Sequence, residues 1–168
     1  DRTLYTLTEK NSDGAGRLTM LVSIQRFAAE RLTEPEPVQR RHGAWFAELG
    51  TPAALQELYR PTGLRRREVL AVELDNLIAT AQNALARGDG QTAAQAVLAA
   101  GQHLETSGPF AAQRTLYESA LALEGPWRPL LLARTANLVW LMGDRSSAEA
   151  YCREALAAGE AAGDRAAE

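Results

Sequence analysis

The helix-breaking segments of this chain recur at a fixed spacing, and this spacing constrains the fold more than any other feature. The stretch GPFAAQRTLYESAL begins at Gly108, and GDRSSAEAYCREAL begins 35 residues later at Gly143. When the two stretches are superposed, Tyr117 falls on Cys152. A period near 34 residues, with two antiparallel helices per unit, is typical of tetratricopeptide repeats. The pattern predicts an all-α, right-handed tetratricopeptide-like solenoid that includes residues 91–168.

The two units agree at some positions and differ at others. Three residues of the second unit match the small and apolar positions of such a repeat: Ala148, Ala155 and Leu156. The aromatic residue of the second helix is Tyr117 in one unit and Cys152 in the next, and Gly101 of the first helix is replaced by Ala136. The alternative is a helical bundle without repeats in which the spacing of the breaks is a coincidence.

Apolar periodicity and breaker residues divide the rest of the chain. A β-hairpin is expected at the N-terminus, with short strands near 4–8 and 17–21 around the turn NSDGAG. Helices are expected near 22–33, 37–49, 52–59, 64–87, 91–106, 109–123, 128–142 and 145–162. Gly88 is predicted to be a left-handed helix cap and Asp89 the N-cap of the next helix. The predicted organisation has three parts: hairpin and linker helix (1–33), helical linker or capping region (34–90), and repeats truncated at the C-terminus (91–168).

No sequence motif points to catalysis, a metal or a cofactor. The pattern GxxxxGK[ST] of phosphate-binding loops is absent, as are HExxH and CxxC. His42 has no partner at metal-ligand spacing and is expected to pack or form a hydrogen bond. The single cysteine, Cys152, is expected to be a small buried thiol between helices. Trp45, Trp127 and Trp140 are expected in packing positions, with Trp140 alternatively lining a groove.

Composition adds two further expectations. A single cysteine excludes an intramolecular disulfide, and no apolar run reaches 18 residues, so a cytoplasmic protein is expected. Arginines cluster in the N-terminal part and could form a basic patch for phosphate or for an acidic partner: Arg40, Arg41, Arg65, Arg66 and Arg67. An ordinary solvated helix face is the alternative for this cluster.

Three segments resemble one family of proteins, in the order in which that family has them. GRLTMLVSIQRFAAERL resembles RYRLLETIREYALERL, VQRRHGAWFAEL resembles a segment beginning RRHAAYF, and VELDNLIATAQNALARGD resembles EHDNLRAALAWALERGD. These patterns belong to bacterial signal-transduction ATPases with numerous domains, many of them transcriptional regulators. Val22 departs from the pattern, which has Glu at that position. The resemblance implies the end of a winged-helix domain followed by tetratricopeptide-like repeats, downstream of an NB-ARC-like nucleotide-binding core.

The resemblance implies a function in protein–protein interaction. The chain would be a sensor or scaffold that docks a protein partner, the chain's own upstream ATPase core or a small-molecule inducer, with no enzyme activity, DNA contact or membrane contact of its own. The expected partner-binding residues are those of the helices that would line a concave groove: Asn83, Arg87, Gln95, Gln102, Arg134, Asn137 and Trp140. The alternatives are a DNA-contacting winged-helix fragment and the C-terminal array of a kinase or cyclase.

Overall fold

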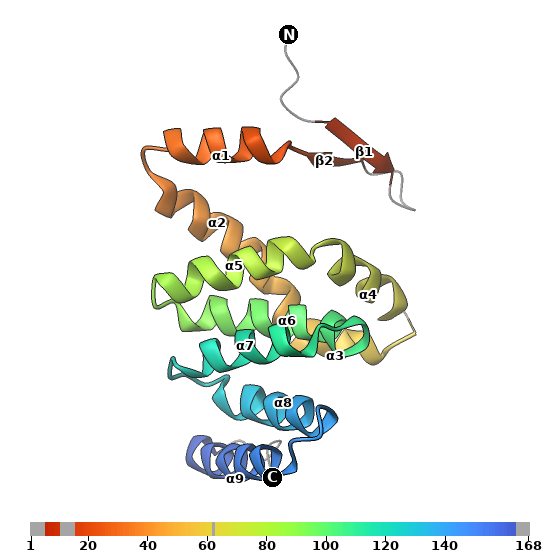
Figure 1. The fold of residues 1–168 in the computed structure, drawn as a ribbon, viewed down its shortest axis with the longest axis vertical. Coiled ribbons are helices and arrows are strands. Elements are labelled where there is room, and N and C mark those ends of the chain that lie inside the picture. Colours follow the sequence, from red (N-terminus) through yellow and green to blue (C-terminus); the bar gives the residue numbers. More distant parts are fainter. Residues whose placement is uncertain (1–5, 11–15, 62, 164–168) are drawn as a thin grey trace. The chain divides into compact units, whose positions relative to one another are not determined.

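The computed structural model describes residues 6–10, 16–61 and 63–163 of the chain, and it divides into two compact units (Figure 1). Unit 1 extends to Val38, and unit 2 begins at Gln39. Helix α2, Pro35–Ala47, spans the boundary between the two units. Each unit is described separately below.

Unit 1 holds a pair of strands and a helix. Strand β1, Thr6–Lys10, pairs in an antiparallel manner with β2, Gly16–Thr19, with an irregularity in register between Thr8 and Lys10. Residues 4 and 5 of the first expected strand lie outside the described residues. Helix α1, Val22–Arg31, follows directly and has no buried residue. Its Phe27 ring is half exposed and carries the Arg31 guanidinium 3.5 Å from its centroid.

All regular structure described in unit 2 is helical. After α2 come η1 (Glu48–Gly50), α3 (Pro52–Gln56), η2 (Glu57–Tyr59), α4 (Gly63–Val72), α5 (Leu74–Ala86), α6 (Gly90–Ser107), α7 (Phe110–Leu121), α8 (Arg128–Leu141) and α9 (Arg145–Ala162). Each helix from α6 to α9 packs against the helix before it, and Figure 1 shows these helices stacked in chain order. Within the described residues, no helix combines the length and apolarity that crossing a membrane requires.

The expected continuous helix at 64–87 is interrupted at Glu73, so that prediction is wrong. Glu73 adopts φ −97° and ψ 10°, outside the helical region, although its backbone hydrogen bonds to Val69 and Leu77 are kept. Both halves contact α6, but α4 also contacts η2, whereas α5 also contacts α7. The bend lets Leu70 and Leu77 both be buried against these different neighbours.

Local capping chemistry sets the helix ends that were predicted. Gly88 and Gly143 have φ of 70° and 88°, a conformation that side chains other than glycine rarely adopt. The carboxylate of Asp89 accepts a hydrogen bond from the backbone N–H of Thr92 at 3.2 Å. These contacts confirm the predicted cap at Gly88 and the N-cap at Asp89. His42 also behaves as predicted, since its Nδ1 lies 3.3 Å from the Thr80 hydroxyl.

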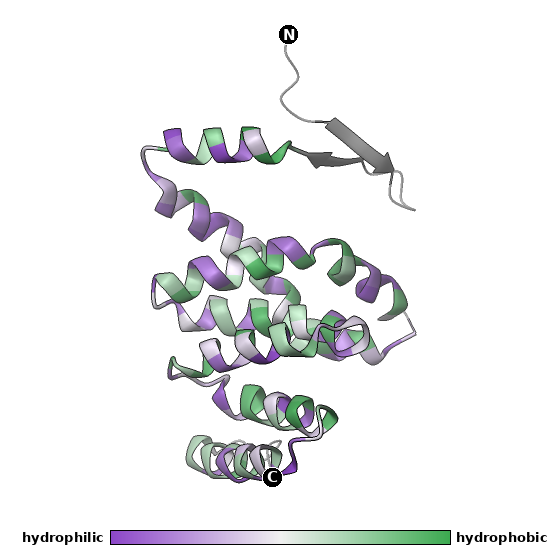
Figure 2. Cartoon of the chain, viewed as in Figure 1, coloured by the Kyte–Doolittle hydropathy of each residue, from purple (hydrophilic) through white to green (hydrophobic). Residues whose placement is uncertain are grey.

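The hydrophobic core of unit 2 is built around α6. One cluster of buried residues joins leucines from α3 to α5 with α6 and with Tyr117, Leu131 and Leu138 of α7 and α8. In Figure 2 the ribbon of α8 is mainly coloured as hydrophobic. Trp127 packs against this cluster as predicted. Trp45 does not, because it is 75% exposed on α2, and its predicted packing role is wrong.

Candidate partner-binding site

The residues predicted to bind a partner do not form one surface. Asn83, on α5, is half buried. Arg87 has only 13% of its side chain exposed; its Nη1 donates to Gln39 Oε1 at 3.3 Å, and its Nη2 lies 3.9 Å from Asp89 Oδ2. Arg87 therefore ties α2 to the end of α5. Gln95 lies where α6 runs directly against η1.

A second group, Gln102 and Arg134, belongs to a largely enclosed polar cluster. Arg134 Nη1 lies 3.7 Å from Glu105 Oε1, an ion pair without a hydrogen bond, and its Nη2 lies 3.4 Å from the hydroxyl of Tyr59. Burial raises the pKa of Glu105, while Arg134 and then Arg67 act to lower it. Gln102 is 4% exposed and lines a small cavity of about 30 Å³. These contacts link η2, α6 and α8, and Arg67 of α4 lies within electrostatic range of Glu105.

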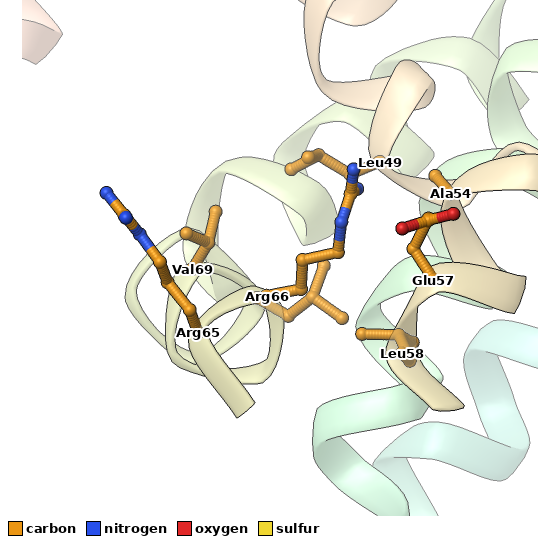
Figure 3. Close-up of a pocket in the computed structure, with 8 residues that line it drawn as sticks. Leu49, Ala54, Glu57, Leu58, Arg65, Arg66 and Val69 are labelled. Atoms are coloured by element: carbon orange, nitrogen blue, oxygen red, sulfur yellow. The ribbon is translucent and has the colours of Figure 1, made fainter. Parts of the chain in front are cut away.

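The five predicted basic-patch residues also have different surroundings. Arg40 and Arg41 are exposed on α2, and the other three lie on α4. Arg65 and Arg66 line a cavity of about 450 Å³ opposite Glu57, where Figure 3 shows the Arg66 side chain extending across the opening. Arg67 instead lies with its guanidinium 5.9 Å from the Tyr59 ring and within electrostatic range of Glu105.

The third group, Asn137 and Trp140, lines an open groove between α8 and α9. Its volume is about 630 Å³. Its apolar lining comes from both helices: Ala133, Ala136, Trp140, Ala148, Cys152, Ala155 and Leu156. Its polar lining comprises three residues: Asn137, Arg145 and Glu149. Trp140 is 59% exposed and Leu156 is 42% exposed, so large apolar side chains face solvent here. We call this surface the α8–α9 groove.

Comparison with the preceding helix pair explains why this groove is hollow. In α6 and α7 the Tyr117 ring fills the space over Gly101, so closely that an added Cβ on Gly101 would lie 1.9 Å from the hydroxyl. The 35-residue offset places Ala136 and Cys152 at these positions in α8 and α9. Cys152 is exposed, and the expectation of a buried thiol is therefore wrong. A small residue in place of the tyrosine leaves its volume unfilled.

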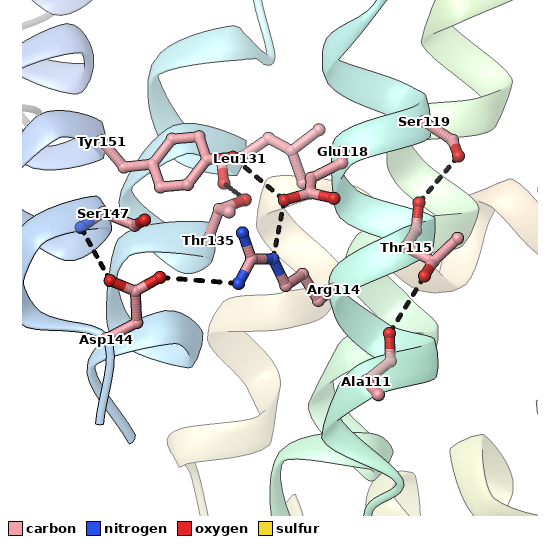
Figure 4. Close-up of polar contacts among 10 residues, drawn as sticks. All are labelled: Ala111, Arg114, Thr115, Glu118, Ser119, Leu131, Thr135, Asp144, Ser147 and Tyr151. Carbon is pink, nitrogen blue, oxygen red and sulfur yellow. Dashed lines mark hydrogen bonds and ion pairs between the residues drawn. The ribbon is translucent and has the colours of Figure 1, made fainter. Parts of the chain in front are cut away.

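Polar contacts hold α9 against α7 beside the groove (Figure 4). Arg114 Nε donates to Glu118 at 2.8 Å, and its Nη1 lies 3.6 Å from Asp144 at the start of α9. Tyr151 donates its hydroxyl hydrogen to Glu118 at 3.2 Å. Hydrogen bonds from Ser147, with Arg114 nearby, lower the pKa of Asp144. These contacts link α9 to α7.

The groove offers a mainly apolar contact surface with a few polar groups. Its lining residues include one thiol, one guanidinium and one carboxylate, with no histidine to act as a base. Across the described ranges, no three side chains of His, Cys, Asp or Glu are grouped so that they could hold a metal ion. The sequence did not lead us to predict that Cys152 and Leu156 are exposed in this groove. The exchange of Tyr117 for Cys152 between the two units was the signal that could have revealed it.

Comparisons with protein-family models, curated proteins and solved structures gave no match to this chain.

Proposed function

We propose that unit 2 is a right-handed tetratricopeptide-like solenoid that serves as a protein-interaction module. Support comes from successive helices that pack on one another and from the 35-residue correspondence between α6–α7 and α8–α9. The close approach of Tyr117 to Gly101 is the kind of contact between a small residue and an aromatic one that pairs the helices of such a repeat. Solenoids of this type bind through extended surfaces built from several repeats.

We further propose that the module belongs to a bacterial regulatory ATPase, as a transcriptional regulator's sensor arm. The support is the sequence resemblance, whose three segments fall on β2 and α1, on α2 and on α5. The nucleotide-binding chemistry would reside in an upstream core, and the repeats would hold that core inactive until a partner docks. The reading frame upstream of Asp1 tests this part directly. A GxxxxGK[ST] loop followed by a winged-helix pattern is expected there, and an unrelated domain would refute it.

The single observation that carries the docking function is the α8–α9 groove. In unit 2 the α6–α7 pair is covered by α8, whose Leu131 and Leu138 lie in the same buried cluster as Tyr117. The equivalent surface of α8–α9 is open and contains the unfilled space next to Cys152. The occupant that fits is a helix, from a partner protein or from a further repeat, that carries aliphatic residues seven positions apart, as α8 does, and a bulky aromatic side chain on the same face.

The thiol of Cys152 reports occupancy of the groove, because it is the chain's only cysteine and is exposed. A capped peptide with two leucines seven residues apart and a phenylalanine on the same face should slow alkylation of Cys152 by iodoacetamide, by about fivefold or more at saturation. A peptide with serine at these three positions is the control. Protection should be lost in Trp140→Ala and kept in Trp45→Ala, which removes an exposed tryptophan from α2 instead.

Two results would refute docking at this groove. One is an alkylation rate that does not change with peptide concentration. The other is a rate that falls as the protein itself is concentrated, which would identify a second copy of the chain as the occupant. Intact-mass spectrometry measures both rates.

A further inference from the structure

We propose that unit 2 has a second docking surface, along α4, which binds an amphipathic helix that is acidic at one end and basic at the other. We call it the α4 groove and define it by Trp45, Leu49, Leu58, Arg66 and Val69. The inference rests on the proposed interaction function and names a class of partner for it. It uses none of the residues of the α8–α9 groove, so the two surfaces can be tested separately.

The α4 groove consists of two adjoining cavities. The first, of about 450 Å³, has Leu49, Leu58 and Val69 among its apolar lining. The second, of about 350 Å³, is lined in part by Trp45 and shares Leu49 and Val69 with the first. Trp45 is 75% exposed and Val69 is 42% exposed. Two hollows separated by a shared pair of residues suit a partner that inserts two apolar side chains from one face of a helix.

The two ends of the groove carry opposite charge. At the first cavity, Glu57 is already paired with Arg60 at 3.0 Å, and Arg66 adds a further positive charge. No hydrogen bond or ion pair of Arg66 is found among the described residues, and Figure 3 shows its side chain over the opening. At the second cavity the lining includes the carboxylates of Glu48 and Glu73, and Glu73 Oε2 also accepts a hydrogen bond from Asn76 at 2.6 Å.

This polarity selects the partner. An acidic end placed over Arg66 and a basic end placed beside Glu48 satisfy both charges, while a partner with a single sign of charge is repelled at one end. The apolar residues between them supply contact area, and the charges fix the direction in which the helix lies. Duplex DNA is disfavoured because its phosphates would lie against Glu48 and Glu73, and because it has no apolar side chains to fill the two cavities.

Fluorescence anisotropy with two labelled helical peptides tests the proposal on the full chain. The bipolar peptide has leucines on one face, glutamates at one end and lysines at the other, and the dibasic peptide has lysines at both ends. The wild type should bind the bipolar peptide about tenfold more tightly. The double variant Arg65→Glu, Arg66→Glu should reverse this preference, because both ends of its groove are then acidic.

Matched variants distinguish a role of the α4 groove from effects of net charge or of misfolding. Arg153→Glu reverses the charge of an exposed arginine on α9 and should leave both affinities unchanged. Trp45→Ala should lower the affinity for both peptides about fivefold, whereas Trp140→Ala should change neither affinity. Circular dichroism shows whether each variant is folded, and the Cys152 protection assay shows whether the α8–α9 groove still binds.

Three outcomes would overturn the proposal. The first is that neither peptide binds the folded wild type at millimolar concentration. The second is that the Arg65→Glu, Arg66→Glu variant behaves like Arg153→Glu. The third concerns a labelled short DNA duplex measured in the same assay. If the wild type binds this duplex and the double variant loses that binding while its affinities for both peptides are unchanged, the arginines would be assigned to phosphate contacts. Failure here with Cys152 protection intact would reject the α4 groove alone.

Discussion

Replacing Gly101 by alanine should destabilise the protein, although alanine is the better helix former. Gly101 lies inside α6 and is buried, and the Tyr117 ring of α7 lies directly over it. A Cβ at this position would lie 1.9 Å from the Tyr117 hydroxyl and 2.7 Å from the ring carbon that bears it. Tyr117 is fully buried, and Gln113 donates to its hydroxyl at 3.0 Å. The ring therefore cannot move without disturbing the packing of α7 on α6.

The magnitude follows from three opposing effects. The change from glycine to alanine in a helix interior contributes about 1 kcal/mol of stability. Overpacking of a filled core costs about 1–3 kcal/mol. Displacing the Tyr117 hydroxyl from Gln113 leaves a buried polar group unpaired, at about 1–3 kcal/mol. The net loss should be about 2 kcal/mol, which for a chain of this length lowers the midpoint of thermal unfolding by about 4–8 °C.

Urea denaturation of four proteins measures this cost and its origin: the wild type, Gly101→Ala, Tyr117→Phe and the double variant. Removing the hydroxyl removes the closest clash, so Gly101→Ala should cost about 1 kcal/mol less in the Tyr117→Phe background. Ala136→Gly, at the equivalent position of α8, is the reciprocal control. It should also destabilise, by about 1 kcal/mol, because Cys152 stands where Tyr117 does and glycine is the poorer helix former. A neutral or stabilising Gly101→Ala, or strictly additive effects, would refute the reasoning.

Four further predictions concern helix caps, titration and the exposed thiol. Asp89→Ala should cost about 1 kcal/mol in urea denaturation, because it removes the acceptor for the N–H of Thr92. Burial raises the pKa of Glu105 above its ordinary 4.5, so ionisation of Glu105 destabilises the folded wild type as pH rises above 4.5. The free energy of unfolding of Glu105→Gln should therefore exceed that of the wild type by more at pH 7 than at pH 4, as measured by urea denaturation. The pKa of Asp144 is lowered, so wild type should lose stability relative to Asp144→Asn as pH falls from the ordinary 3.8 through the lowered pKa, in the same assay at acidic pH. Cys152 should react with a maleimide in the folded protein within about tenfold of the rate in denaturant, and strong protection would show that the groove is closed.

Much of the helical organisation was predictable because its signals are local. The glycines at 88 and 143 need left-handed backbone, and the aspartates that follow them cap the next helices, so helix ends could be placed from a few neighbouring residues. The bend at Glu73 could not be placed in this way. Nothing in VLAVELDNL breaks a helix, and the two halves share α6 as a neighbour but differ in their second contact, which is η2 for α4 and α7 for α5.

The candidate site was predicted only in part, for a related reason. Trp140 and Asn137 were named because they avoid the apolar stripe of α8, and both line the α8–α9 groove. Arg87 and Gln102 were named on the same grounds but are largely buried. Whether a polar side chain on a helix faces solvent depends on which other helix covers it, and a single helix pattern does not contain that information.

Tyr117 and Cys152 occupy equivalent positions of the two helix pairs. The difference between them explains both the incomplete sequence match of the second pair and the presence of the α8–α9 groove. In the proposed repeat, the aromatic residue of the second helix packs over a small residue of the first, as Tyr117 does over Gly101. A unit that lacks the aromatic residue therefore matches the pattern less well and also keeps a hollow at that position. On this argument, replacing Cys152 by tyrosine together with Ala136 by glycine should fill the groove, raise stability relative to Ala136→Gly alone and abolish peptide binding together. Stability that rises while peptide binding persists would show that the hollow is not where a partner docks.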